Sequence, residues 1–121
     1  MTGTTQTLSG GTVFTAPAVT PSEYLPNRGV FLAGMLGKDR GDAFGFYFGR
    51  MDPGCEIARE IHPATSETVY ILKGEAIGLC GDAEIPLAPG QVLHVDKNVP
   101  HGLRNAGATV LEFLVIGHPD F

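Results

Sequence analysis

The chain has 121 residues, of which 43% are hydrophobic and 17% are charged, and it carries a formal net charge of −5 at pH 7. This length predicts one domain with a buried core, and the acidic balance argues against nucleic acid or an anionic membrane as a partner. No apolar run approaches the roughly 18 residues that span a bilayer, and the first residues lack the pattern of a signal peptide. We therefore expect a soluble, cytoplasmic protein.

Seventeen glycines and nine prolines separate short apolar runs along the chain, which is typical of turns in an all-β protein. Residues 1–11 contain little to bury and are expected to form a flexible arm, followed by a short edge strand over 12–15 and a loop. No segment of ten or more residues keeps a helical period of apolar positions.

Residues 30–36 and 43–51 alternate as strands and enclose a charged turn, so they predict a hairpin. In the second strand one face carries Phe44, Phe46, Phe48 and Arg50, and the other carries Gly45, Tyr47 and Gly49. We predict that the three phenylalanines lie in the core. The alternative places Tyr47 or Arg50 at the wall of a cavity, where it would contact a substrate.

The stretch 54–74 carries the chemistry. Glu60 and His62 lie two residues apart, so in an extended segment they project from the same face. A break at Pro63 follows, and Glu67 then opens a strand rich in β-branched residues. Imidazole and carboxylate groups that converge from neighbouring strands are typical ligands of a divalent first-row metal.

Further strands are expected over 75–79, 83–87, 91–95, 101–105 and 109–116. Eight to ten short strands separated by turns favour a sandwich or barrel. His101 follows the turn at 96–100, and we consider it a further ligand of the same site.

The residues form two spaced motifs, Gly54-x5-Glu60-x-His62-x4-Glu67-x6-Gly74 and Gly90-x5-Asp96-x-Asn98-x2-His101-x3-Asn105, with fifteen residues between them. This arrangement resembles the two motifs of the cupin superfamily, G-x5-H-x-H-x3,4-E-x6-G and G-x5-P-x-G-x2-H-x3-N. The resemblance implies a double-stranded β-helix, a jelly-roll barrel that occupies the whole chain as one domain, with a metal near one mouth and commonly a homodimer.

The chain departs from the family pattern at three positions: Glu60 replaces a histidine, Asp96 a proline and Asn98 a glycine. Asparagine tolerates left-handed backbone, so we expect a positive φ at Asn98. The change at Glu60 alters the chemistry, because two carboxylates would cancel the charge of a divalent ion and weaken it as a Lewis acid.

We expect His62, Glu67 and His101 to hold manganese, iron or zinc, with Glu60 either as a fourth ligand or as a carboxylate base. Two metal-free alternatives stay open: an acid–base pocket, or a barrel with buried structural histidines. Substrate contacts are assigned to Val69, Ile71, His94, Leu103 and Tyr47, although His94 can equally lie on the outer sheet. By alternation, Tyr70, Arg59 and Arg104 face away from the site.

These residues favour a small metal-dependent enzyme that acts on a small organic molecule by proton transfer, as a lyase, isomerase or cyclase. By analogy with small cupins, the reaction is a tailoring step in small-molecule biosynthesis. One alternative is an iron-dependent dioxygenase. The other, from a different class, is a non-catalytic cupin that binds a small molecule without turnover.

Overall fold

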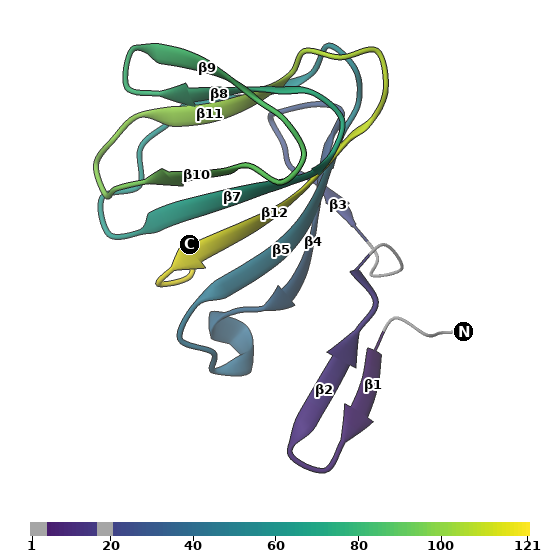
Figure 1. Cartoon of the computed structure of the whole chain (residues 1–121). Helices are drawn as coiled ribbons and strands as arrows, with labels where there is room; N and C mark the ends of the chain where they lie inside the picture. The colour runs from purple at the N-terminus through teal and green to yellow at the C-terminus, as the bar shows by residue number, and fades with distance from the viewer. Residues whose placement is uncertain (1–4, 17–20) are drawn as a thin grey trace.

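The computed structural model describes residues 5–16 and 21–121, and this part of the chain is built almost entirely from antiparallel strands (Figure 1). The strands are β1 (Thr5–Leu8), β2 (Gly11–Phe14), β3 (Ser22–Glu23), β4 (Val30–Leu36), β5 (Gly45–Met51), β6 (Glu56–Glu60), β7 (Ser66–Lys73), β8 (Ala76–Cys80), β9 (Ala83–Leu87), β10 (Val92–Val95), β11 (His101–Asn105) and β12 (Leu111–His118). The charged turn expected after β4 contains a single 3₁₀ turn, Lys38–Arg40. No helix among the described residues has the length and apolar character needed to traverse a bilayer.

Two sheets face each other across the core. The larger has the strand order β10-β7-β12-β5-β4-β3, and the smaller has the order β6-β11-β8-β9. The core between them includes Met51, Ile71, Leu111 and Phe113, all fully buried. This arrangement confirms the expected all-β jelly-roll barrel.

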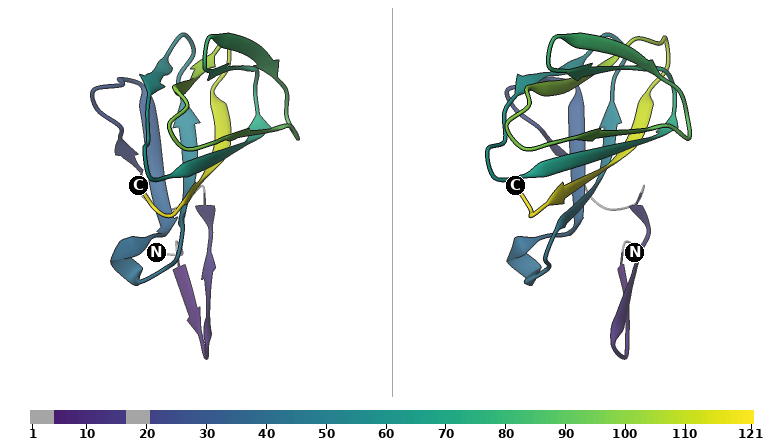
Figure 2. Two further views of the ribbon diagram at one scale, coloured as in Figure 1. Left: turned by 90° about the vertical axis from the view of Figure 1, so that its left-hand side faces the viewer. Right: turned by 60° about the vertical axis from the view of Figure 1, so that its left-hand side comes forward.

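Strands β1 and β2 form a separate hairpin that extends away from the barrel, as the views in Figure 2 show. We expected a flexible arm over residues 1–11, and the structure places Thr5–Leu8 in a paired strand. Residues 1–4 of that expected arm lie outside the described residues. The hairpin is tied to the barrel by Phe14 and Ala16, which pack on the outer face of the larger sheet.

We expected the phenylalanine face of β5 to point into the core between the sheets, and the structure shows the opposite orientation. Phe48 is buried, but with Phe46 it belongs to a cluster on the outer face of the sheet, under Phe14. The inner face of β5 carries Tyr47 and Gly49 instead. A side chain at Gly49 would collide with the ring of Phe113, so the inner face has room for a phenylalanine from β12 only because β5 contributes no side chain there.

Asn98 has φ of 67°, which confirms the expected left-handed turn before His101. Its backbone N–H donates to the carbonyl oxygen of His62 at 3.1 Å. This bond joins the loop that precedes β11 to the segment that follows β6, so two candidate metal ligands are fixed relative to each other by backbone.

Candidate metal centre

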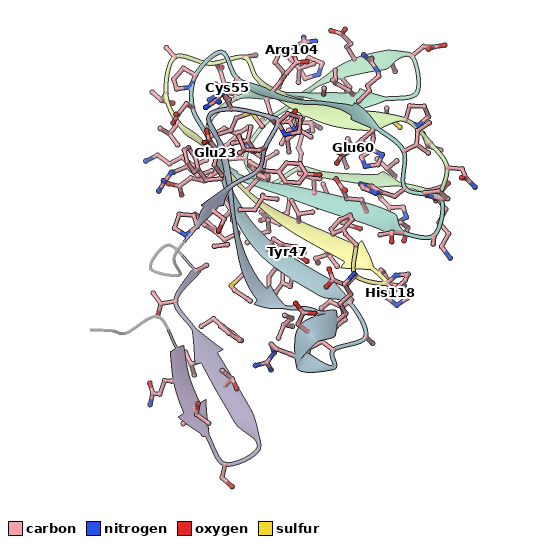
Figure 3. All side chains as sticks on the ribbon, turned by 180° about the vertical axis from the view of Figure 1, so that it is seen from behind. Glu23, Tyr47, Cys55, Glu60, Arg104 and His118 are labelled. Carbon is pink, nitrogen blue, oxygen red and sulfur yellow. The ribbon has the colours of Figure 1, made fainter. Side chains whose placement is uncertain are left out.

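Four side chains with metal-binding groups converge between the two sheets. Glu60 ends β6, His62 follows it, and His101 begins β11, whereas Glu67 comes from β7 of the opposite sheet. His101 is paired directly with Glu60 across the ladder. One ligand atom from each of the four lies within 4.8 Å of the others. Figure 3 shows Glu60 between the sheets and Arg104 on the outer side of the smaller sheet.

The contacts of His101 indicate that a proton or a metal ion lies within the cluster. Its Nδ1 lies 2.8 Å from the carbonyl oxygen of Val99, which only accepts, so Nδ1 carries a proton. Its Nε2 faces a carboxylate oxygen of Glu67 at 3.2 Å, and that oxygen also only accepts. Either a proton or a shared metal ion must therefore lie between the Nε2 atom and the Glu67 oxygen.

The hydrogen bond to Glu67, with help from the carbonyl of Val99, outweighs burial and raises the pKa of His101 above its ordinary value. The second histidine makes similar contacts: His62 Nε2 lies 3.3 Å from Glu60 and 3.9 Å from Glu67. Two imidazole nitrogens and two carboxylates aimed at one point fit a divalent metal, and the carbonyl of Val99 orients His101 as an outer partner does in metal sites.

Tyr24 is a member of the site that the sequence did not reveal. Its hydroxyl donates to both carboxylate oxygens of Glu60, at 3.1 and 3.0 Å. Burial, and then the charge and hydrogen bond of Glu60, raise the pKa of Tyr24 to about 12. Tyr24 lies in the loop before β4, which carries no motif, and only the folded chain brings it to β6.

A cavity of about 220 Å³ lies beside the cluster, and two of the four candidate ligands, Glu60 and Glu67, line it. Its walls are Tyr24, Leu32, Tyr47, Ile57, Glu60, Glu67, Val115 and Phe121. Tyr47 therefore lies at the wall of a cavity, which was our alternative expectation for this residue.

The other expected substrate contacts lie elsewhere. Val69, Ile71 and Leu103 are buried in the core between the sheets and are not among the lining residues. The side chain of His94 is 53% exposed and bonds Thr68 on the outer face, so the structure does not bring it to the cavity. Strand alternation explains this, because Leu93 and not His94 packs against the core. Tyr70 and Arg59 are exposed, as expected.

The C-terminal residues close one side of the cavity. The ring of Phe121 lies 4.9 Å from that of His62 and 5.8 Å from that of Tyr47, between centroids. Asp120 anchors this segment, because it accepts from the Tyr47 hydroxyl at 2.5 Å and from the backbone N–H of Lys38 at 2.8 Å. Burial together with the bond to Asp120 raises the pKa of the Tyr47 hydroxyl. We call Asp120 and Phe121 the C-terminal clasp, and sequence reasoning missed it.

The protein is therefore a small antiparallel jelly-roll barrel with four candidate metal ligands between its two sheets. The family model described as the cupin domain matches residues 47–117, and the chain belongs to that family. The match includes β6, β7 and β11, the strands that carry or adjoin the candidate ligands.

Individual relatives agree with this assignment. An oxalate-binding protein of Thermotoga maritima is 30% identical over 112 residues, which cover 88% of this chain and 93% of the relative. A crystal structure of a predicted oxalate decarboxylase from the same organism is 27% identical, with a TM-score of 0.81 over 88% of this chain and 98% of that one. A polyketide cyclase of Streptomyces resistomycificus is 17% identical with a TM-score of 0.73 over 84% and 75% of the two chains, and shows the fold alone.

Proposed function

We propose that the protein is a metal-dependent cupin enzyme that acts on a small organic substrate by proton transfer. One observation carries the proposal: two histidines and two carboxylates converge within 4.8 Å beside a small, largely apolar cavity. The metal, which we propose to be manganese, iron or zinc, would be held by His62, Glu67 and His101. When bound, it would polarise an oxygen atom of the substrate.

Glu60 has the position of a general base. It belongs to the cluster and also lines the cavity, and the Tyr24 hydroxyl holds its carboxylate in place by sharing one proton between the two oxygens. A carboxylate held this way would accept a proton from a carbon next to a polarised oxygen, and the negative charge would pass to that substrate oxygen. Glu60 would then be a neutral acid, and Tyr24 would donate to its unprotonated carbonyl oxygen. If Glu60 is instead a fourth ligand, its removal will weaken metal binding rather than proton transfer. The reaction would be a lyase, isomerase or cyclase step in small-molecule biosynthesis.

A non-catalytic binding function is the second candidate, since the relative that is 30% identical is named an oxalate-binding protein. An iron-dependent dioxygenase is the third. The three differ in what they do to a bound molecule: proton transfer exchanges a carbon-bound hydrogen with solvent, a dioxygenase consumes oxygen, and a binding protein does neither.

The test is a panel of small hydroxyketones and hydroxyacids incubated with metal-loaded protein in deuterated water. Under the proposal, at least one compound gains deuterium at carbon, the gain disappears with a chelator, and Glu60→Gln slows it by roughly two to four orders of magnitude with metal retained. Glu75→Gln, which removes the same charge outside the lining of this cavity, serves as control. Oxygen uptake coupled to turnover, or tight binding without any exchange across the panel, would overturn it.

We also infer a homodimer and a cytoplasmic location, as expected from the resemblance and the sequence. Sedimentation of the purified protein tests the first of these.

A further inference from the structure

We infer that this cavity takes an uncharged, oxygen-bearing molecule with an apolar body, that it discriminates against dianions such as oxalate, and that Glu60 sets this preference. The inference rests on the proposed metal site and names its substrate class. The ligand preferred by this chain would then differ from the oxalate in the name of the Thermotoga maritima relative.

The charge balance of the cluster is the first reason. Glu60 and Glu67 together bring two negative charges, which cancel a divalent ion, so the loaded site presents no net positive charge to a ligand. A dianion entering this site would lie within a few ångströms of two carboxylates. At that distance like charges repel strongly in a partly desolvated cavity.

The shortage of free donors is the second reason. Among the described residues that line the cavity, none is lysine or arginine. The two lining hydroxyls are already committed to carboxylates, Tyr24 to Glu60 and Tyr47 to Asp120. A carboxylate ligand would have to compete with Glu60 and Asp120 for these hydrogen bonds, and all of these groups carry the same charge. A hydroxyl ligand can instead donate a hydrogen bond of its own to either carboxylate.

The size and walls of the cavity are the third reason. At about 220 Å³ it is below the roughly 300 Å³ at which pockets for drug-sized ligands begin, so the ligand must be small. Four lining side chains are apolar: Leu32, Ile57, Val115 and Phe121. An alkyl or aryl portion of a ligand is stabilised against these walls, while a ligand made only of carboxylates leaves them unused.

The experiment measures ligand binding by calorimetry on protein saturated with manganese, with acetoin, lactate and oxalate as probes. All three offer two neighbouring oxygens and differ in charge by one unit at each step. Wild type is compared with Glu60→Gln, which keeps the shape, with Glu60→His, and with Glu75→Gln as the matched charge control. Metal content is measured on every sample.

We expect both Glu60 variants to bind oxalate at least roughly tenfold more tightly than wild type, lactate by a smaller factor, and acetoin within about threefold. Glu75→Gln should match wild type for all three probes. If wild type holds metal and binds oxalate as tightly as the Glu60 variants do, or more tightly than it binds acetoin, this inference is wrong while the proposed metal site stands. If wild type holds no metal at the cluster, the proposed function itself fails.

Discussion

At the scale of single residues, the contact between Tyr24 and Glu60 determines how one carboxylate of the site is held. A hydroxyl that donates to both oxygens of one carboxylate compensates part of the cost of placing Glu60 beside Glu67. Tyr24 therefore holds the Glu60 carboxylate in position.

We predict that Tyr24→Phe lowers the free energy of unfolding of the metal-free protein by about 1 kcal/mol, because the carboxylate loses its donor while the ring stays in place. Tyr70→Phe is the control, since Tyr70 faces outward and is 41% exposed. Urea denaturation of both variants measures the difference. Equal stability of Tyr24→Phe and wild type would show that the bond contributes nothing.

Not every residue of the site could be predicted from the sequence. Alternation relates Glu60 to His62 locally, and the resemblance to the two cupin motifs predicted that Glu67 and His101 join them from other strands. It also predicted the left-handed turn at Asn98. Tyr24 and Phe121 come from segments with no motif, and only long-range packing brings them to the cavity. Their position was therefore not predictable from spacing.

At the scale of elements, β5 shows where pattern reading was misleading. Three phenylalanines in period 2 favour burial, and Phe48 is indeed buried, but under Phe14 and Ala16 on the outer face. Period 2 tells which residues share a face without telling which face meets the barrel interior. The glycine at position 49 was the better guide, since it marks the close approach of another side chain.

We predict that Gly49→Ala destabilises the protein by about 1–3 kcal/mol, because the added methyl group would overlap the ring of Phe113 in a packed core. Gly11→Ala in β2 is the control, since a methyl group there would meet its nearest neighbour only at 4.0 Å. Thermal unfolding of the two variants gives the comparison. A Gly49→Ala protein as stable as Gly11→Ala would contradict the inward orientation of this face of β5.

The C-terminal clasp predicts a dependence of stability on pH. Burial opposes ionisation of Asp120, but bonds from Tyr47, Lys38 and Phe121 outweigh it and lower the pKa of this carboxyl below its ordinary value of 3.8. Because the folded pKa is lowered, the stabilisation is fully present above the ordinary value and is lost as the pH falls through the folded pKa.

Wild type should therefore exceed Asp120→Asn in stability at neutral pH, and the difference should shrink as the pH falls below about 4. Asp96→Asn is the matched control, with a side chain that is 86% exposed. Denaturant unfolding at several pH values tests this. A difference that stays constant down to the lowest accessible pH would refute the role of the ionised Asp120.

At the scale of the whole molecule, the two sheets act as a frame that brings ligands from distant parts of the chain to one point. β6 and β11 supply three of them from the smaller sheet and its adjoining segment, and β7 supplies Glu67 from the larger. A metal bound there would bridge the sheets, so binding should stabilise the folded barrel as a whole.

Metal content is the most direct measure of the central claim. We predict that wild type, purified without added metal, contains close to one divalent transition metal per chain, and that His62→Ala loses it while remaining folded by circular dichroism. His94→Ala, whose exposed imidazole lies outside the site, should keep full occupancy. Full occupancy in His62→Ala, or equal loss in His94→Ala, would contradict a metal centre at Glu60, His62, Glu67 and His101.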